Sequence, residues 1–322
     1  MNTIGVYTSG GDAPGMNACI RAVVRSASYY NIEVKGIKEG YQGMIENKIV
    51  NMDSSSVANI IQRGGTILKT ARSEEFKTQN GRKKAFDNLL HHKIDGLICI
   101  GGNGSYTGAK IFSTEYQMPV IGVPGTIDND LFGTDYTIGY DTATNTALDA
   151  IDKIRDTADS HNRVFLVEVM GRDAGYIALN VGIAGGAEGI LIPEDAQDFD
   201  KLTKYFKKEK RKKSFSIIVI AEGDEEGGAI KLGEKLKATF PYLSIKTTVL
   251  GHVQRGGSPT VKDRILASRL GANAVKNLVE GESQKAVGII NDKLSICSLD
   301  EAISKHKDFP KELINLAEVL GS

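Results

Sequence analysis

The stretch 120–130 reads VIGVPGTIDND, an apolar run followed at once by a tight loop that carries two carboxylates, Asp128 and Asp130. Upstream, a second apolar run, residues 96–100, ends in the glycine-rich segment GGNGS at 101–105. Short apolar runs bounded by glycine and polar residues are typical of buried strands that lead into turns. A glycine turn lets phosphates approach the backbone, and paired carboxylates can hold a metal ion or accept a proton. Together, the two loops indicate the parts that phosphoryl transfer requires.

Short runs rich in Ile and Val alternate with longer amphipathic segments along the chain. The strand-like runs span residues 4–8, 97–100, 120–123, 164–169, 190–192, 217–220, 247–250 and 287–290. The helix-like segments include residues 16–29, 142–157 and 258–278. Strands that are apolar on both faces and separated by helices predict an α/β fold with parallel sheets and crossover helices. Ligands of such sheets bind beyond the carboxyl ends of the strands, where the glycine and charged clusters of this chain also lie.

The composition limits the classes of partner and of compartment. At 322 residues, the chain suits two α/β lobes better than a single core, with a boundary expected near residues 137–141. Lys plus Arg (40) balance Asp plus Glu (40), so no overall basic charge indicates a nucleic-acid partner. The cysteines, Cys19, Cys99 and Cys297, are odd in number and far apart, which argues for a reducing compartment. Because there is neither a membrane-length apolar stretch nor a signal-peptide pattern, we expect a soluble cytoplasmic protein.

Four further clusters each have a functional and a structural interpretation. Segment 8–17, TSGGDAPGMN, is a strand-to-helix turn that can bind an anion through its amides or can simply be a turn. Arginines in segments 170–172 (MGR) and 251–257 (GHVQRGG) suit a phosphorylated substrate, although surface ion pairs are the alternative. The basic run 207–213, KKEKRKK, is either a solvated helix end or a second anion site.

Asp128 and Asp130 are expected to point to the same side, because alternate residues of an extended loop share a face. One carboxylate can then accept a hydroxyl proton while the other holds or orients a metal ion. An acidic helix cap is the alternative for this loop, and an ordinary strand-end turn is the alternative for segment 101–105.

Taken together, these segments resemble the ATP-dependent 6-phosphofructokinases of the bacterial type. The motifs that carry the resemblance run in order through segments 8–17, 63–66, 71–72, 126–130, 170–172, 250–252 and 256–259. The resemblance implies the phosphofructokinase fold, with two Rossmann-like lobes of mainly parallel sheets flanked by helices. The implied lobes are residues 1–138 plus about 251–302, which bind ATP, and residues 139–250 plus about 303–322, which bind fructose 6-phosphate. It also implies a homotetramer whose active sites are shared across an interface.

The resemblance implies transfer of the ATP γ-phosphoryl group to the 1-hydroxyl of fructose 6-phosphate. Asp128 matches the base for that hydroxyl, and Thr126 and Asp130 match residues that position substrate and Mg²⁺. Gly11, Arg72 and Arg172 match groups that assist the transferring phosphoryl group or its acceptor. The implied ATP contacts are Gly11, Tyr41, Arg72, Ser73, Gly102, Asn103, Gly104, Ser105 and Gly108, with Asn103 and Asp130 at the metal. The implied fructose 6-phosphate contacts are Thr126, Ile127, Asp128, Arg163, Met170, Gly171, Arg172, Glu222, Lys246, His252, Val253, Gln254 and Arg255.

Arg163 and Lys246 match residues that a neighbouring subunit contributes in this family, although arginine is usual at the position of Lys246. The family also has an effector site at which ADP activates and phosphoenolpyruvate inhibits. The matching positions are Arg21, Arg25, Arg155, Gly186, Glu188, Arg211 and Lys213. Three positions depart from the pattern, since Ser54, Asn59 and Phe215 stand where Arg, Asp and His are usual. We therefore expect weakened or altered effector control.

Two glycines bear on the phosphoryl donor. Diphosphate-using members of the superfamily have Asp and Lys where this chain has Gly104 and Gly125, so the resemblance favours ATP.

Asn103 stands where Asp is usual and removes a negative charge from the expected Mg²⁺ site. This substitution leaves open a regulatory subunit that has lost catalysis, whereas Asp128, Arg72 and Arg172 favour an active enzyme. A dinucleotide-binding dehydrogenase is disfavoured, because no Gly-x-Gly-x-x-Gly follows the first strand.

Overall fold

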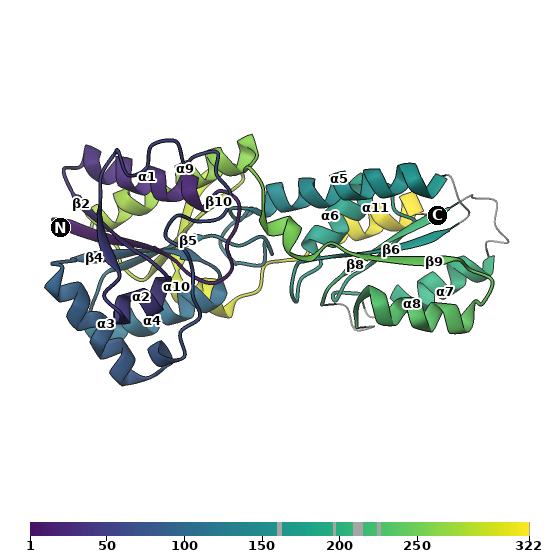
Figure 1. Ribbon diagram of the computed structural model, residues 1–322, viewed down its shortest axis with the longest axis horizontal. Coiled ribbons are helices and arrows are strands. Elements are labelled where there is room, and N and C mark those ends of the chain that lie inside the picture. The colour runs from purple at the N-terminus through teal and green to yellow at the C-terminus, as the bar shows by residue number, and fades with distance from the viewer. Residues whose placement is uncertain (160–162, 196–197, 209–214, 224–226, 322) are drawn as a thin grey trace. The chain divides into compact units, whose positions relative to one another are not determined.

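The computed structural model describes residues 1–159, 163–195, 198–208, 215–223 and 227–321 (Figure 1). The chain divides into two compact units. Unit 1 comprises Met1–Ile127, Leu131–Thr142 and Arg255–Lys307. Unit 2 comprises Asp128–Asp130, Ala143–Gln254 and Asp308–Ser322.

Unit 1 is built on a seven-stranded sheet in the order β11-β10-β5-β4-β1-β2-β3. Its strands are β1 (Thr3–Thr8), β2 (Glu33–Ile37), β3 (Ile49–Met52), β4 (Gly96–Gly101), β5 (Val120–Pro124), β10 (Lys285–Ile290) and β11 (Lys293–Ser298). The inner pairs are parallel, and the edge strands β3 and β11 pair antiparallel with their neighbours. The predicted mainly parallel sheet is therefore confirmed. Three of its strands, β2 and the antiparallel edges β3 and β11, were not among the predicted strand-like runs.

Helices cover both faces of this sheet. They are α1 (Met16–Tyr29), α2 (Gly40–Ile45), α3 (Gln79–His91), α4 (Asn103–Tyr116), α9 (Val261–Val279) and α10 (Leu299–Ser304). Figure 1 shows α1 and α9 on one face and α2, α3, α4 and α10 on the other. In α1, Met16, Ile20 and Val23 are buried at helical spacing, so one apolar stripe packs against the sheet.

Unit 2 contains a parallel four-stranded sheet in the order β7-β8-β6-β9. The strands are β6 (Val164–Val169), β7 (Gly189–Leu191), β8 (Ser216–Ala221) and β9 (Ile245–Val249). Its helices are α5 (Tyr140–Asp159), which begins in unit 1, α6 (Tyr176–Ala184), α7 (Asp198–Lys208), α8 (Gly228–Thr239) and α11 (Lys311–Gly321). Figure 1 shows α5, α6 and α11 on one face of the sheet and α7 and α8 on the other.

The strand order reverses direction once in each sheet. In unit 1 the chain runs from β1 outward to β2 and β3, then returns to the other side of β1 with β4 and β5. In unit 2 the corresponding reversal lies between β8 and β6, because the chain leaves β6 toward β7 and leaves β8 toward β9 on the opposite side. Such switch points are where open α/β sheets bind ligands, because the loops on either side diverge and leave a crevice.

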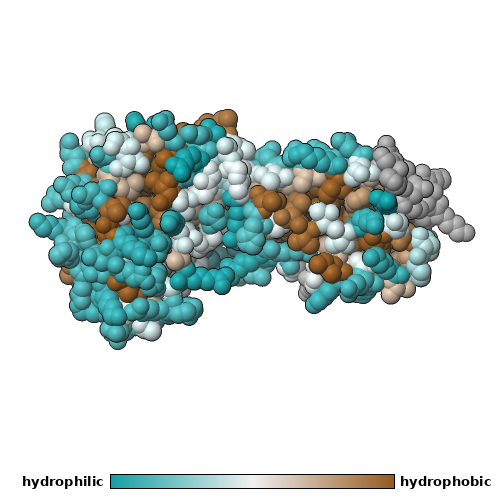
Figure 2. Space-filling view, viewed as in Figure 1, coloured by the Kyte–Doolittle hydropathy of each residue, from teal (hydrophilic) through white to brown (hydrophobic). Residues whose placement is uncertain are grey.

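Apolar side chains form patches on the face of both units that Figure 2 draws. The exposed large apolar side chains include Tyr29, Ile230, Tyr242, Val249, Val261 and Ile265. Patches of this kind are typical of surfaces that contact other proteins. Among the described residues, no helix combines the length and hydrophobicity needed to cross a membrane.

Candidate functional site

Three loops of unit 1 meet at the carboxyl ends of adjacent strands, because β5, β4 and β1 are neighbours in the sheet. Backbone hydrogen bonds join the three loops directly. The Ser9 N–H donates to the Ile100 carbonyl (3.0 Å), and the Gly125 N–H donates to the Gly101 carbonyl (3.0 Å). The sequence-predicted turns after these strands therefore form one continuous surface at the switch point of unit 1.

The loop after β4 opens directly into helix α4. Gly102 precedes this helix in an extended conformation, and no side chain caps it. Asn103 and Gly104 are exposed in the first turn, and a Cβ atom on Gly104 would meet nothing within 4 Å. Uncapped amides at a helix N-terminus carry a partial positive charge, so this turn can bind phosphate oxygens.

The Tyr41 side chain stabilises the first turn of α4. Its hydroxyl donates to the Ser105 carbonyl (2.5 Å), and burial raises the pKa of the hydroxyl, which keeps it a neutral donor. The ring stacks on Phe76 with centroids 4.1 Å apart and lies against Gly108, where a Cβ atom would come within 2.9 Å of it. Tyr41 thus lies in the core, where it is 8% exposed and packs against α4. Ser73 is half-buried, and its hydroxyl donates to the Gln42 side chain (2.6 Å).

The loop after β1 carries Gly11 beside an arginine. A Cβ atom on Gly11 would lie 2.8 Å from Nη1 of Arg255, so the absence of a side chain lets the guanidinium rest on the loop. The structure therefore places Arg255, a predicted fructose 6-phosphate residue, against a predicted phosphoryl-transfer residue in unit 1. Arg72 lies in the same unit, and its side chain is exposed.

Asn17 ties two of the sequence motifs together. Its side-chain amide donates to the carbonyls of Arg63 and Gly64, both at 3.1 Å, and its oxygen accepts the Ile67 N–H at 2.8 Å. Gly64 in turn packs on Gly257, where a Cβ atom would meet the Gly257 carbonyl oxygen at 2.3 Å. Sequence reasoning placed Asn17 in a motif but gave it no role, because its burial, 1% exposed, is visible only in the fold.

The turn after β5 is fixed along its first residues. Gly125 is buried and forms a bridge with Ile138, and a Cβ atom on Gly125 would come within 2.9 Å of Ile100. The Thr137 hydroxyl donates to the Thr126 carbonyl (2.6 Å). Ile127 is buried as the apolar anchor of the turn.

The expected extended conformation of this loop is wrong at Asn129. Its φ of 56° is left-handed, a region that asparagine tolerates better than most residues, so the chain bends between Asp128 and Asp130. The rule that alternate residues share a face therefore does not apply to this pair. Both carboxylates are half-buried.

In unit 2, the loops at the ends of β6, β8 and β9 are also joined. The N–H groups of Gly171 and Arg172 donate to Oε1 of Glu222 (3.3 and 2.7 Å), and the Met170 N–H donates to Oε1 of Gln254 (2.8 Å). Gln254 is fully buried, and its Nε2 has no hydrogen-bond partner among the described residues. The structure thus brings together four of the predicted sugar-phosphate positions with Glu222 at the switch point of unit 2.

Arg172 adopts a left-handed conformation, with φ 56°, and its side chain is 69% exposed. A left-handed non-glycine residue is strained, and such strain often marks a functional position. His252 and Val253, after β9, are exposed next to the buried Gln254. The arginine and the histidine are therefore available to a solvent-borne ligand.

Arg163 and Lys246 lie at the other end of the same sheet. Arg163 directly precedes β6, and Lys246 pairs with Phe165 at the start of β9. Met170 directly follows β6, so the full six-residue strand separates the two groups. At about 3.3 Å per residue, that separation is roughly 20 Å. The structure does not bring Arg163 and Lys246 together with the other predicted sugar-phosphate residues of the chain.

The predicted effector residues are divided between the units. Arg21 and Arg25 lie on α1 in unit 1. In unit 2, the Arg155 guanidinium donates to the Gly185 and Gly186 carbonyls and lies 5.6 Å from the centre of the Phe215 ring. The Glu188 carboxylate accepts the Ile217 N–H (2.8 Å). Arg211 and Lys213 lie outside the described residues.

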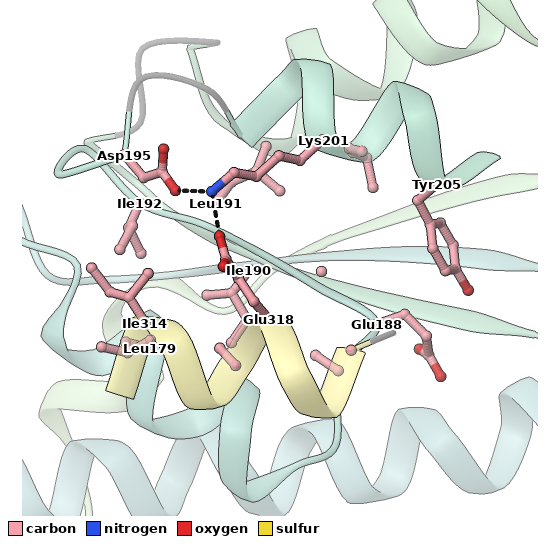
Figure 3. A pocket seen from close by; sticks show the side chains of 15 residues that line it. Leu179, Glu188, Ile190, Leu191, Ile192, Asp195, Lys201, Tyr205, Ile314 and Glu318 are labelled. Atoms are coloured by element: carbon pink, nitrogen blue, oxygen red, sulfur yellow. Dashed lines mark hydrogen bonds and ion pairs between the residues drawn. The ribbon is translucent and has the colours of Figure 1, made fainter. Parts of the chain in front are cut away.

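A cavity of about 370 Å³ lies elsewhere in unit 2, between α6, β7, α7 and α11 (Figure 3). Its walls are apolar, and Lys201 forms ion pairs across it with Asp195 (2.6 Å) and Glu318 (2.7 Å). Glu188 is the single predicted site residue that is among the described residues lining this cavity. No residue of the loops after β1, β4 and β5 is among the described residues that line this cavity.

Comparison with known proteins identifies relatives over the full length of the chain. Residues 3–278 match the family described as phosphofructokinase. An ATP-dependent 6-phosphofructokinase of Cytophaga hutchinsonii is 54% identical over 322 residues, which cover 100% of this chain and 98% of that protein. ATP-dependent 6-phosphofructokinase 1 of Thermus thermophilus is 56% identical over 324 residues and 100% of both chains. The structure of phosphofructokinase from Saccharomyces cerevisiae superposes with a TM-score of 0.86 at 35% identity, over 99% of this chain and 47% of that chain. The motif resemblance is confirmed, and the chain belongs to the phosphofructokinase family.

Proposed function

We infer that the protein is an ATP-dependent 6-phosphofructokinase, which transfers the γ-phosphoryl group of ATP to the 1-hydroxyl of fructose 6-phosphate. The products are fructose 1,6-bisphosphate and ADP. The observation that carries this inference is identity of 54 and 56%, over essentially the whole of both chains, to relatives named for that activity. The alternative of a regulatory subunit without catalysis is not favoured, because those relatives are named as the enzyme.

The geometry of unit 1 suits the nucleotide. Phosphoryl transfer needs positioning and charge stabilisation more than covalent chemistry. The exposed amides of Asn103 and Gly104 would receive phosphate oxygens, and Arg72 would neutralise charge that develops on the transferring group. Gly11 would let the transferring group approach the backbone of the first loop.

The sugar phosphate belongs to the switch point of unit 2. There, Arg172 and His252 are exposed, and Glu222 holds the Gly171 and Arg172 amides in place. An arginine fork suits the phosphate, and a carboxylate suits sugar hydroxyls. Asp128 would accept the proton of the 1-hydroxyl as its oxygen attacks phosphorus.

The donor set also fits Mg²⁺ that arrives with ATP. No group of three or more His, Cys, Asp or Glu side chains in the described ranges could cage a metal ion. Mg²⁺ is usually held by one or two protein carboxylates plus substrate phosphates, so the Asp130 carboxylate and the amide oxygen of Asn103 are each of a type that would suit the ion. When bound, the ion supplies positive charge that offsets the negative charge of the phosphates.

We expect Asn103→Asp to raise kcat at limiting Mg²⁺ by about tenfold, which corresponds to ~1.4 kcal/mol of transition-state stabilisation. The added carboxylate restores the negative charge that Mg²⁺ prefers. The measurement is a Mg²⁺ titration at fixed ATP. Thr114→Asp adds the same charge at the exposed far end of α4 and should leave the Mg²⁺ dependence unchanged. An unaltered Mg²⁺ dependence in Asn103→Asp would contradict the assignment.

Two glycines favour ATP over diphosphate as donor. The open space at Gly104 leaves room for the rest of a nucleotide beyond its phosphates. Gly125 is packed against Ile100 and Met16, so this backbone has no space for the lysine of diphosphate-using members. The test of the proposed function is a coupled assay for fructose 1,6-bisphosphate with ATP or diphosphate as donor. Product with ATP supports it, and absence of product with ATP overturns it.

The sugar-phosphate site is proposed to be shared between subunits of a homotetramer. Arg163 and Lys246 lie roughly 20 Å from Met170 along β6. This separation favours a role for both residues in the active site of a neighbouring subunit. The exposed apolar side chains of both units supply surface for such association.

Effector control is expected to be weak. The Arg155 guanidinium is committed to two carbonyls, Phe215 offers it an uncharged ring, and Ser54 lacks the charge of arginine. We expect ADP and phosphoenolpyruvate to change the half-saturating fructose 6-phosphate concentration by less than about fivefold, the low end of typical coupling. Saturation curves with and without each effector measure this. Strong sigmoidal control would contradict it, and Phe215→His should increase the response.

A further inference from the structure

Asp263 is a fully buried carboxylate that neither the sequence motifs nor the proposed chemistry uses. Its Oδ1 accepts the Gly139 N–H (2.9 Å), and its Oδ2 accepts both the Thr142 N–H (2.8 Å) and the Thr142 hydroxyl (2.5 Å). Burial raises the pKa of this carboxyl, and the bonds from Thr142 and Gly139 oppose that shift. Three hydrogen-bond donors satisfy this one buried carboxylate, which indicates a specific structural role and not a chance contact.

The position of Asp263 joins two helix starts. It lies in the first turn of α9, where its own N–H donates to the side chain of Thr260, the N-cap. Gly139 and Thr142 lie at the start of α5. One carboxylate therefore receives the N-terminal amides of α5 while it sits at the N-terminus of α9, and both helix dipoles favour negative charge there.

The segment that Asp263 holds, residues 137–142, contacts the turn after β5, residues 124–128, which we call the catalytic turn because it carries the proposed base Asp128. The Ile138 N–H donates to the Pro124 carbonyl (2.9 Å), and the Thr137 hydroxyl donates to the Thr126 carbonyl (2.6 Å). These bonds fix the backbone immediately before Ile127 and Asp128. A shift of the segment would therefore be passed directly to the turn that carries the proposed base.

The same segment also packs on the loop after β1. A Cβ atom on Gly15 would lie 2.7 Å from Cγ2 of Ile138, and a Cβ atom on Gly139 would lie 2.6 Å from Cβ of Ala13. Gly139 has φ 102°, which other residues rarely adopt, so the close approach depends on glycine. Two of the three phosphate-site loops thus rest on one segment.

We propose that Asp263 is a positioning residue for phosphoryl transfer, which acts through Gly139 and Thr142 to hold residues 137–142 against both the catalytic turn and the loop after β1. This rests on the proposed function, since the positioned loops are those of the kinase site. Because the carboxylate is fully buried, it would act through these loops and not by contact with a substrate.

Asp263→Asn tests the proposal because the amide has the same shape but only one oxygen. It can accept from Gly139 or from Thr142, and its NH₂ group then faces a donor. We expect kcat to fall by about 10²-fold, as small misplacements of a reacting group can cause, with KM for both substrates within about twofold. Thr142→Val removes one of the three bonds to Asp263, together with the bond that the hydroxyl accepts from the Thr260 N–H (3.0 Å), and should lower kcat less.

The double variant Asp263→Asn with Thr142→Val should be slower than Asp263→Asn by less than the effect of Thr142→Val alone, because the bond between the two side chains can be lost only once. The matched control is Ser298→Ala, which removes the capping box of α10 in the same unit. It should lower the melting temperature and leave kcat unchanged.

The outcomes separate positioning from mere stability. A lower kcat with unchanged KM values and a non-additive double variant supports the proposal. Normal kcat per folded molecule in Asp263→Asn, or in Thr142→Val if Asp263→Asn does not fold, overturns it. So does a rise in KM at unchanged kcat. A wild-type protein that forms no product from ATP overturns the proposed function first, and this inference with it.

Discussion

Replacing Asp128 with asparagine should lower kcat by about 10²–10⁴-fold, the usual contribution of a positioned general base. The amide keeps the size and hydrogen-bonding reach of the carboxylate but cannot accept the proton of the 1-hydroxyl. Because ground-state contacts survive, we expect KM for fructose 6-phosphate to change by less than about threefold. Initial rates in the coupled assay at saturating ATP and Mg²⁺ measure both quantities.

Asp135→Asn is the matched control for this experiment. Asp135 lies seven residues further along the same connection, where its carboxylate accepts the Asn291 N–H (2.7 Å) outside the proposed site. Its replacement should leave kcat unchanged even if it loosens the contact with Asn291. If Asp128→Asn instead kept kcat within tenfold of the wild-type value, Asp128 would not be the base, and another acceptor for the proton would be needed.

The sequence predicted the parts of the fold that depend on local pattern. The apolar runs became β1, β4, β5, β6, β7, β8, β9 and β10, and segment 16–29 became α1 with the same bounds. The segment expected to be helical from residue 258 begins instead at Val261, because Thr260 caps it. A strand that is buried on both faces consists of a continuous apolar run, so its position can be predicted from the sequence. The missed strands, β2 and the edge strands β3 and β11, carry mixed, partly exposed residues and leave no comparable signal.

The loops after the strands were readable for a different reason. Glycines are required where backbones approach closely, as at Gly125 against Ile100, and so mark the binding edge of the sheet. The backbone conformation inside a loop cannot be predicted from the local sequence in the same way. At Asn129 the left-handed φ depends on the contacts of the whole turn, and the expectation of an extended chain failed there.

Buried polar residues formed the third class. Asn17 and Asp263 organise the loops through bonds to residues 46 and more positions away in sequence. Nothing in their local sequence distinguishes them from surface residues, because the partners are brought to them only by the folded sheet. Tyr41 is a related case, since its bond to the Ser105 carbonyl and its stacking on Phe76 are visible only in the fold, and its contact with ATP stays a prediction.

A mixture of two impaired variants should regain activity if the sugar-phosphate site is shared between subunits. Arg163→Ala and Arg172→Ala each remove a charged partner of the phosphate, a loss of about 1.5–3 kcal/mol that weakens fructose 6-phosphate binding strongly. The two residues lie at opposite ends of β6. In a hybrid oligomer, one subunit can then supply an intact Arg172 while its neighbour supplies an intact Arg163.

Equal co-expression of the two variants should restore about a quarter of the sites. A complete site needs a subunit with intact Arg172 on one side and a neighbour with intact Arg163 on the other, and each is present with a probability of about one half. The measurement is kcat/KM for fructose 6-phosphate of hybrids purified through a different tag on each variant. Arg163→Ala mixed with Lys246→Ala is the decisive control. These residues lie at the same end of the sheet and would enter the same site from the same subunit, so every site stays defective. Absence of recovery in the first mixture, or equal recovery in both, would contradict the proposed sharing of the site. Recovery in the first mixture alone requires that Arg163 and Arg172 of one bound substrate come from different chains.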